Sequence, residues 1–143
     1  MALVIGKTYR IKSHAGEGRF LRLATGTQTV SVGKVLQTSI DDPDNTSQHW
    51  NVISNSGTKI VSAINNAYAL NFDTTDSERK AEIYPYSNSD ANASIDLVIV
   101  DSGKKIYKIR ITIDGTMYYL TSGSATSTTY TTWELASGGD NQK

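Results

Sequence analysis

The chain has 143 residues, 38% of them hydrophobic and 20% charged, with a formal net charge of zero and no cysteine. This size and composition predict one globular domain, 1–143, with a buried core, and exclude a disordered chain. They also argue against nucleic-acid or membrane partners, which usually attract basic proteins, and exclude disulfides and thiolate chemistry.

Strand-like runs follow one another along the whole chain. Each run alternates polar and apolar residues and is rich in β-branched and aromatic residues, which is typical of half-buried strands. Turn formers such as Asp42-Pro43-Asp44 and Asp114-Gly115 separate the runs. No stretch of helical length has helical periodicity, so we expect an all-β protein with at most a short helical turn. The runs cover residues 6–11, 20–23, 35–38, 50–53, 57–61, 69–72, 82–86, 97–100, 103–109, 118–120 and 130–135.

The runs fall into three repeats. Gly6, Gly57 and Gly103 begin similar runs, which divides the chain into approximate units 6–56, 57–102 and 103–143. Near the end of the first unit the chain reads Asn45-Thr46-Ser47-Gln48-His49-Trp50, and it ends with Gly138-Gly139-Asp140-Asn141-Gln142-Lys143. The corresponding phrase of the second unit, 92–97, has its key residues replaced. We expect the Gln side chain to satisfy backbone groups of the preceding loop and the Trp to fill the core.

These repeats resemble the ricin-B-type β-trefoil lectins, whose units end in Gln-x-Trp, and most of all the mushroom lectins of this fold. The resemblance covers essentially the whole chain. It implies a β-trefoil of about twelve strands in three four-stranded repeats with pseudo-threefold symmetry. It also implies a fungal lectin for galactose or N-acetylgalactosamine-type glycans, active as a hemagglutinin if it carries several sites or forms a homodimer.

The resemblance also implies where sugar would bind. In these lectins an Asp on the second strand binds sugar hydroxyls, an aromatic residue on the third strand stacks on the sugar, and an Asn before Gln-x-Trp completes the site. The corresponding residues are Arg22, Gln37, Thr38 and Asn45 in the first unit, Asn71, Tyr84, Tyr86 and Asn88 or Asn92 in the second, and Tyr119, Trp133 and Asn141 in the third.

The usual Asp is missing from all three units. Arg22 and Tyr119 can donate hydrogen bonds in its place, and Asn71 can both donate and accept them. Asp73 lies two residues beyond Asn71, on the same face if the strand continues, and is a candidate substitute. The number of working sites therefore stays open.

Two other functions are compatible with a β-trefoil. A β-trefoil protease inhibitor would act through a protruding loop, at 39–45 or 74–80, and an interaction or storage protein would need no small ligand. We expect no catalytic residues, metal or cofactor, because the two histidines, His14 and His49, lack metal-like spacing and no nucleophile motif is present.

The chain ends raise two further expectations. Residues 1–5 are too few and lack the basic residues of a secretory signal, so we expect a cytoplasmic protein, with release by a non-classical route left open. The third unit reaches Lys143 without a fourth run. Either a tail follows in the native protein, which we favour, or Ala2-Leu3-Val4-Ile5 closes the barrel.

Overall fold

The computed structural model describes residues 5–14, 19–23, 34–40, 44, 46–54, 57–85, 92–122, 130–137, 139, 142 and 143. In these residues the chain forms strands and one short 3₁₀ helix, which confirms the all-β prediction. The elements are β1 (Thr8–Tyr9), β2 (Arg19–Leu23), β3 (Lys34–Ile40), η1 (Thr46–Gln48), β4 (Trp50–Ser54), β5 (Thr58–Ser62), β6 (Tyr68–Phe72), β7 (Ala81–Pro85), β8 (Ile95–Asp101), β9 (Ile106–Ile113), β10 (Thr116–Thr121) and β11 (Thr132–Glu134).

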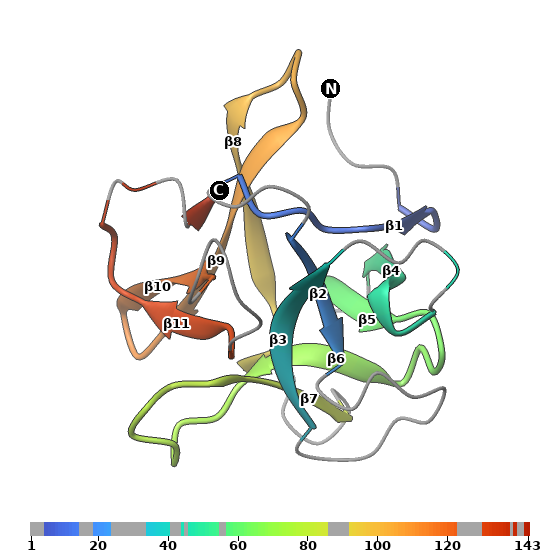
Figure 1. Cartoon of the computed structure of the whole chain (residues 1–143). Coiled ribbons are helices and arrows are strands. Elements are labelled where there is room, and N and C mark those ends of the chain that lie inside the picture. The colour runs from blue at the N-terminus through green and yellow to red at the C-terminus, as the bar shows by residue number, and fades with distance from the viewer. Residues whose placement is uncertain are drawn as a thin grey trace.

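The three units share one arrangement of strands (Figure 1). The second and third strands of each unit form an antiparallel pair, β2–β3, β6–β7 and β10–β11. The outer strands pair with one another as a barrel wall, β1 with β4, β4 with β5, β5 with β8 and β8 with β9. This is the predicted β-trefoil arrangement. Eleven strands are seen rather than about twelve, because the described part of the third unit has no strand after β11.

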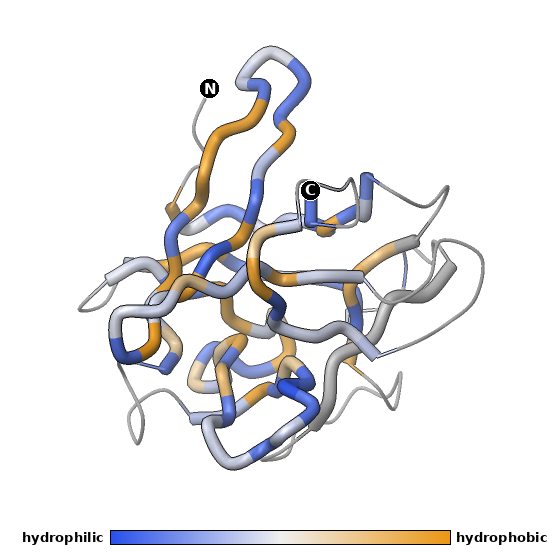
Figure 2. The backbone as a smooth tube through the Cα atoms, turned by 90° about the vertical axis from the view of Figure 1, so that its left-hand side faces the viewer, coloured by the Kyte–Doolittle hydropathy of each residue, from blue (hydrophilic) through white to orange (hydrophobic). Residues whose placement is uncertain are grey.

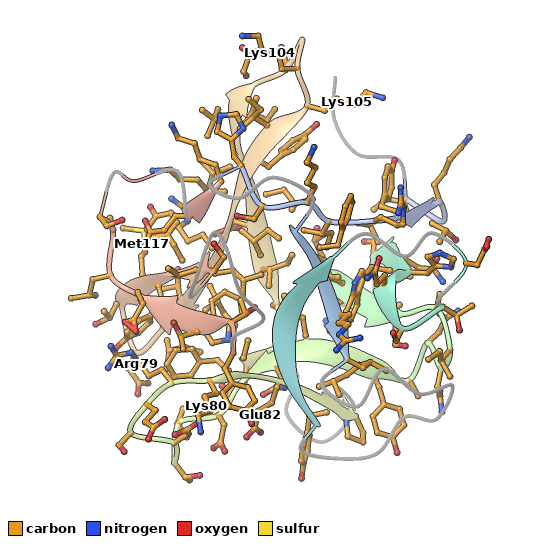
Figure 3. The ribbon with its side chains drawn as sticks, viewed as in Figure 1. Arg79, Lys80, Glu82, Lys104, Lys105 and Met117 are labelled. Atoms are coloured by element: carbon orange, nitrogen blue, oxygen red, sulfur yellow. The ribbon has the colours of Figure 1, made fainter. Side chains whose placement is uncertain are left out.

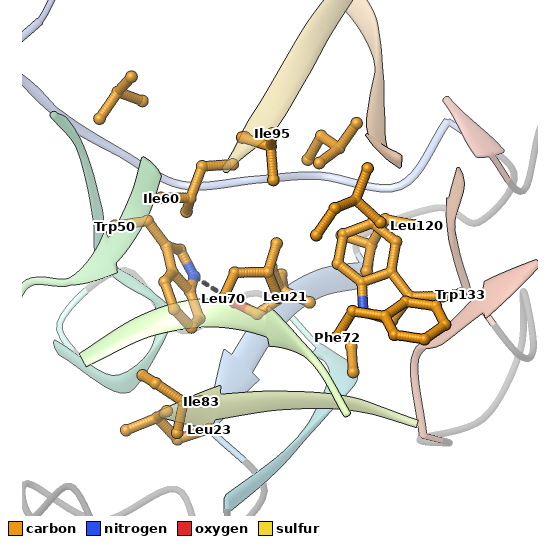
Figure 4. Packing of buried hydrophobic residues seen from close by; sticks show 14 residues of the cluster. Leu21, Leu23, Trp50, Ile60, Leu70, Phe72, Ile83, Ile95, Leu120 and Trp133 are labelled. Carbon is orange, nitrogen blue, oxygen red and sulfur yellow. Dashed lines mark hydrogen bonds between the residues drawn. The ribbon is translucent and has the colours of Figure 1, made fainter. Parts of the chain in front are cut away.

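The core is formed by one face of every hairpin (Figure 4). Trp50 and Trp133 are fully buried, and they lie at opposite sides of the core in Figure 4, with Leu21 and Leu70 between them. Each indole N–H finds a backbone acceptor: Trp50 Nε1 donates to the Leu21 carbonyl at 3.1 Å, and Trp133 Nε1 donates to the Asn71 carbonyl at 3.1 Å. A buried indole without such a partner would leave its polar group unsatisfied.

The glutamine of the repeated phrase has a structural role. Gln142 is buried, and its Nε2 donates to the Leu135 carbonyl at 2.8 Å and to Thr121 Oγ1 at 3.2 Å. Its Oε1 accepts from the backbone N–H of Ser137 at 3.0 Å. The expectation that this glutamine satisfies backbone groups of the preceding loop is thus confirmed for Gln142.

Steric constraints explain why the second unit begins with a glycine. Gly57 has a φ of +116°, and a Cβ there would lie 2.9 Å from Ser94 Oγ. A larger residue would therefore be strained both by its backbone conformation and by this close approach.

The β8–β9 hairpin projects beyond the rest of the molecule, as Figure 2 shows. Its turn is held by Asp101 Oδ1, which accepts from the backbone N–H of Lys104 at 3.1 Å. Ile99 and Val100 near the tip are 53% and 43% exposed, so this end of the hairpin does not contribute to the core.

The packing of Trp50 predicts a large effect of its removal. We expect Trp50→Ala to lower the free energy of unfolding by about 3–5 kcal/mol, because it leaves a cavity and orphans the Leu21 carbonyl. Urea unfolding followed by circular dichroism measures this. The control Met117→Ala, at a side chain that is 48% exposed, should change stability by less than about 0.5 kcal/mol. A loss below about 1 kcal/mol for Trp50→Ala would contradict the packing.

Candidate functional site

The register of each hairpin sets a polar residue opposite the position where the resembled lectins have Asp. Arg22 faces Gln37, Asn71 faces Glu82 and Tyr119 faces Glu134. Residues opposite each other in a sheet have side chains on the same face. Glu82 and Glu134 did not emerge from the sequence. Each adjoins a buried residue of its strand, Ile83 or Trp133, and that alternation is the signal that marks them as outward-facing.

In the second unit, the structure corrects the role expected of Asn71. Its side chain is only 4% exposed, so it cannot be the main contact for a sugar at the surface. Its Nδ2 has no hydrogen-bond partner among the described residues. The accessible polar group at this pair is instead Glu82, which is half-buried on β7.

Asp73 and Glu82 bring two carboxyl groups together. Asp73 Oδ1 accepts from Thr75 Oγ1 at 2.6 Å and from the Thr75 backbone N–H at 2.9 Å, and these bonds lower the pKa of Asp73. Burial, followed by the negative charges of Asp73 and Asp76, raises the pKa of Glu82. The interaction between the two carboxyl groups contributes to both shifts, lowering the pKa of Asp73 and raising that of Glu82. When the pair holds one proton, Glu82 therefore carries it.

An aromatic residue completes this face. Tyr84 lies two residues after Glu82 on β7, opposite Ala69 of β6, so the alternation of the strand puts its side chain on the same face as Glu82. Its side chain is half-buried. The structure thus brings together three sequence candidates of the second unit, Asn71, Asp73 and Tyr84, with Glu82 added. Figure 3 shows Glu82 at the same edge of the molecule as Lys80.

The candidate site of the first unit is less completely described. Arg22 is half-buried on β2, and its Nε has no hydrogen-bond partner among the described residues. On β3, Gln37 and Thr38 lie opposite Arg22 and Leu21, with only their backbones described. Four further candidates, Asn45, Tyr86, Asn88 and Asn141, lie outside the described residues.

In the third unit, the structure exchanges the roles of two aromatic residues. Trp133 was expected to stack on sugar, but it is fully buried and packs near Phe72, with ring centroids 6.2 Å apart. Its place in the core excludes it from a surface site. Tyr119, expected at the Asp position, is instead a half-buried aromatic residue, with Lys108 Nζ 5.4 Å from its ring centroid.

Tyr119 belongs to a row of polar residues across four strands. Asp96, Arg110, Tyr119 and Glu134 are successive cross-strand partners on β8, β9, β10 and β11. Arg110 Nη2 lies 3.2 Å from Asp96 Oδ2. Its hydrogen bond with Tyr119, and then the Asp96 carboxylate, raise the pKa of Arg110. The Tyr119 hydroxyl is therefore already engaged within the protein.

The loop at 74–80, one candidate for an inhibitory loop, is held against the third unit. Arg79 Nε donates to the Trp133 carbonyl at 2.8 Å, and Arg79 Nη2 lies 2.9 Å from Glu134 Oε2. In return the Trp133 backbone N–H donates to the Arg79 carbonyl at 2.8 Å. The Arg79 side chain is thus turned toward β11. Of the other loop, 39–45, most residues after β3 lie outside the described part.

Two features are absent from the described residues. No group of three or more His, Asp or Glu side chains there is placed to hold a metal ion. Within the same residues, no helix has the length and apolar character needed to cross a bilayer.

The chain is similar in fold to several solved structures. A designed threefold-symmetric protein, ThreeFoil, is 20% identical, with a TM-score of 0.72 and coverage of 94% of each chain. The C-terminal half of an earthworm R-type lectin, in complex with GalNAc, is 20% identical, with a TM-score of 0.66 and coverage of 96% of this chain and 95% of that one. A mosquitocidal holotoxin is 19% identical, with a TM-score of 0.77, but the match covers 98% of this chain and 17% of the toxin.

By sequence alone, no protein-family model and no curated protein matches the chain. Together with the three-unit arrangement of strands, the structural likenesses show that the chain folds as a β-trefoil.

Proposed function

We propose that the protein is a lectin that binds galactose- or N-acetylgalactosamine-containing glycans through the outward face of the β6–β7 hairpin. The observation that carries the proposal is the register of the hairpin, which sets Glu82 opposite Asn71 and on the same face as Tyr84, with the charge of Asp73 near enough to raise the pKa of the partly buried Glu82. The proposal is for a binding protein rather than an enzyme.

The chemistry of this face suits a sugar. Carboxylate oxygens accept hydrogen bonds from sugar hydroxyls, and a tyrosine ring can cover the apolar C–H side of a pyranose. Both carboxyl groups are positioned by a hairpin whose opposite face is locked in the core through Leu70, Phe72 and Ile83. A shallow site of this kind leaves much of the sugar in water, so we expect affinities of about 1 mM, or about −4 kcal/mol.

Two further facts support this class of ligand. The repeated Asn/Gln phrases resemble those of ricin-B-type lectins, and the fold is like that of an earthworm lectin solved with GalNAc. Agglutination needs a second site or a second copy of the chain. Tyr119 and Glu134 of the third unit face each other across its hairpin as Asn71 and Glu82 do in the second, but Glu134 is already paired with Arg79.

Substitutions on the β6–β7 face test the proposal. We expect Glu82→Gln and Tyr84→Ala each to weaken binding of methyl galactoside or GalNAc about tenfold, through loss of a charged acceptor and of the stacking ring. Tyr84→Phe should retain binding because it keeps the ring. Chemical-shift titration of labelled protein measures the affinities at this face.

The matched control is Glu78→Gln, which makes the same chemical change at a glutamate whose side chain is 69% exposed on the neighbouring loop. It should leave the affinity unchanged. If Glu82→Gln and Tyr84→Ala bind both sugars as the unaltered protein does, the β6–β7 face is not the site.

The titration of Glu82 predicts a pH dependence of binding. As the pH falls through the raised pKa of Glu82, above its ordinary 4.5, the carboxylate gains a proton and loses acceptor capacity. We expect affinity to fall over that range, while Asp73, whose pKa is lowered, stays ionised. Calorimetric titrations at several pH values should show a flatter profile for Glu82→Gln.

The same group predicts a pH dependence of stability without any ligand. Because folding raises the pKa of Glu82, its ionisation costs more in the folded protein than in the unfolded chain. Below the unfolded pKa, Glu82 is protonated in both states and imposes no such cost. The cost develops as the pH rises from there through the folded pKa. Thermal unfolding should therefore show Glu82→Gln gaining stability over the unaltered protein as the pH rises, and an advantage that shrinks with rising pH would contradict the assignment.

A further inference from the structure

The outward face of the first hairpin carries a guanidinium group. Arg22 lies on β2 between two buried core residues, Leu21 and Leu23, so the alternation of the strand turns its side chain away from the core. The residue opposite Arg22 on β3 is Gln37, which carries no charge. Arg22 therefore sets the charge of this part of the face.

The corresponding place in the second hairpin has the opposite charge. On β6, Asn71 lies between buried core residues in the same way, and it faces Glu82, with Asp73 two residues further along the chain. The two hairpins are neighbours, because β3 pairs with β7 (Figure 1). An anion would be repelled by the carboxyl groups of the second hairpin and attracted by the guanidinium of the first.

Arg22 differs from two other arginines in having no carboxylate partner. Arg79 pairs with Glu134, and Arg110 pairs with Asp96. Arg22 is half-buried, its Nε is shielded from solvent without a hydrogen-bond partner, and no ion pair joins it to a residue that the structure describes. Because this guanidinium is partly withdrawn from water without gaining a counter-ion, binding of an anion would compensate for the lost hydration.

The rest of this face is also basic. Phe20, two residues before Arg22 and so on the same face, is buried but lies outside the core cluster. The Arg10 guanidinium covers it, with the central carbon 4.6 Å from the ring centroid. Lys12 pairs with Phe20 across the strands. Three basic residues, Arg10, Lys12 and Arg22, thus lie along this side of β2.

The shape of a guanidinium selects the kind of anion. Its Nε–H and one Nη–H point in the same direction and donate to two oxygens at once, which suits a carboxylate or a sulfate. A neutral hydroxyl group offers no such pair of charged acceptors.

We propose that the outward face of the β2–β3 hairpin binds an acidic sugar, with the carboxylate or sulfate of the sugar on Arg22. The inference rests on the proposed function for the sugar part of the ligand, while the choice of an acidic sugar rests on the unpaired guanidinium. The protein then carries two kinds of site on neighbouring hairpins, one for neutral and one for acidic sugars.

The test compares three galactose derivatives that differ in charge. Methyl galactoside, methyl galacturonide and galactose sulfated on its primary hydroxyl are each titrated into ¹⁵N-labelled protein. We expect both acidic sugars to shift the Arg22 Nε–H signal and the Arg22 and Leu23 amide signals, with about tenfold higher affinity than methyl galactoside. Raising sodium chloride from about 20 mM to about 300 mM should weaken this binding severalfold, because salt screens the charge of a half-buried group.

Substitutions separate the role of Arg22 from a general effect of charge. Arg22→Gln should lower the affinity for both acidic sugars to that for methyl galactoside, and Arg22→Lys should retain part of the preference because it keeps the charge but not the paired donors. Lys7→Gln is the matched control, since it removes the same charge at an exposed residue before β1, and it should keep the full preference. An unchanged Trp50 indole signal shows that each variant is folded, because that indole bonds to the neighbouring Leu21 carbonyl.

The outcomes distinguish this inference from the proposed function. If methyl galactoside shifts the Glu82 and Tyr84 signals but no acidic sugar shifts those of Arg22, this inference alone is overturned. If an acidic sugar binds at Arg22 and no sugar binds at the β6–β7 face, the inference stands and the proposed site there fails. Binding of only one of the two acidic sugars supports the inference and identifies the anion. The inference is also overturned if Lys7→Gln loses the preference as Arg22→Gln does, or if inorganic sulfate binds as tightly as the sulfated galactose, since Arg22 would then hold an adventitious ion only.

Discussion

The hydrogen bonds of the two buried indoles are the constraint on which the hairpins depend. Trp50 and Trp133 can be buried only because the Leu21 and Asn71 carbonyls accept from their ring nitrogens. Both acceptors lie on the second strand of a unit, β2 or β6. Each indole therefore sets how one hairpin sits on the core. Once that face is fixed inward, the alternation of the strands leaves Glu82 and Tyr84 on the outward face.

Asn71 shows how this constraint shaped the candidate site. Its backbone carbonyl serves the Trp133 indole, so β6 lies close to the core at that residue and the side chain is covered. A side chain that is covered in this way cannot also reach a ligand at the surface. The polar groups that can reach one are the carboxyl groups of Asp73, beyond the end of β6, and of Glu82, across the hairpin.

Much of the fold could be predicted because repeats and alternation are local signals. The runs that begin after Gly57 and Gly103 became β5 and β9, and every other predicted run overlaps a strand. The site was predicted less well because it depends on how deeply each side chain is buried, which the sequence pattern does not reveal. Nothing local distinguishes Trp133, which lies in the core, from Tyr119, which lies outside it: both are aromatic residues in alternating strands. Glu82 was missed because its importance comes from its cross-strand partner, which only the register reveals.

The contacts around Arg79 couple two units that the sequence repeats would treat as separate. The Ala81 N–H donates to the Thr131 carbonyl, and the Trp133 N–H donates to the Arg79 carbonyl, both at 2.8 Å, so the start of β7 is bonded along β11. The Arg79–Glu134 ion pair lies over the same junction. Opening either hairpin would break these bonds along with its own. We therefore expect the second and third hairpins to open as a single cooperative unit in local unfolding, with the amide protons at this junction exchanging with solvent together.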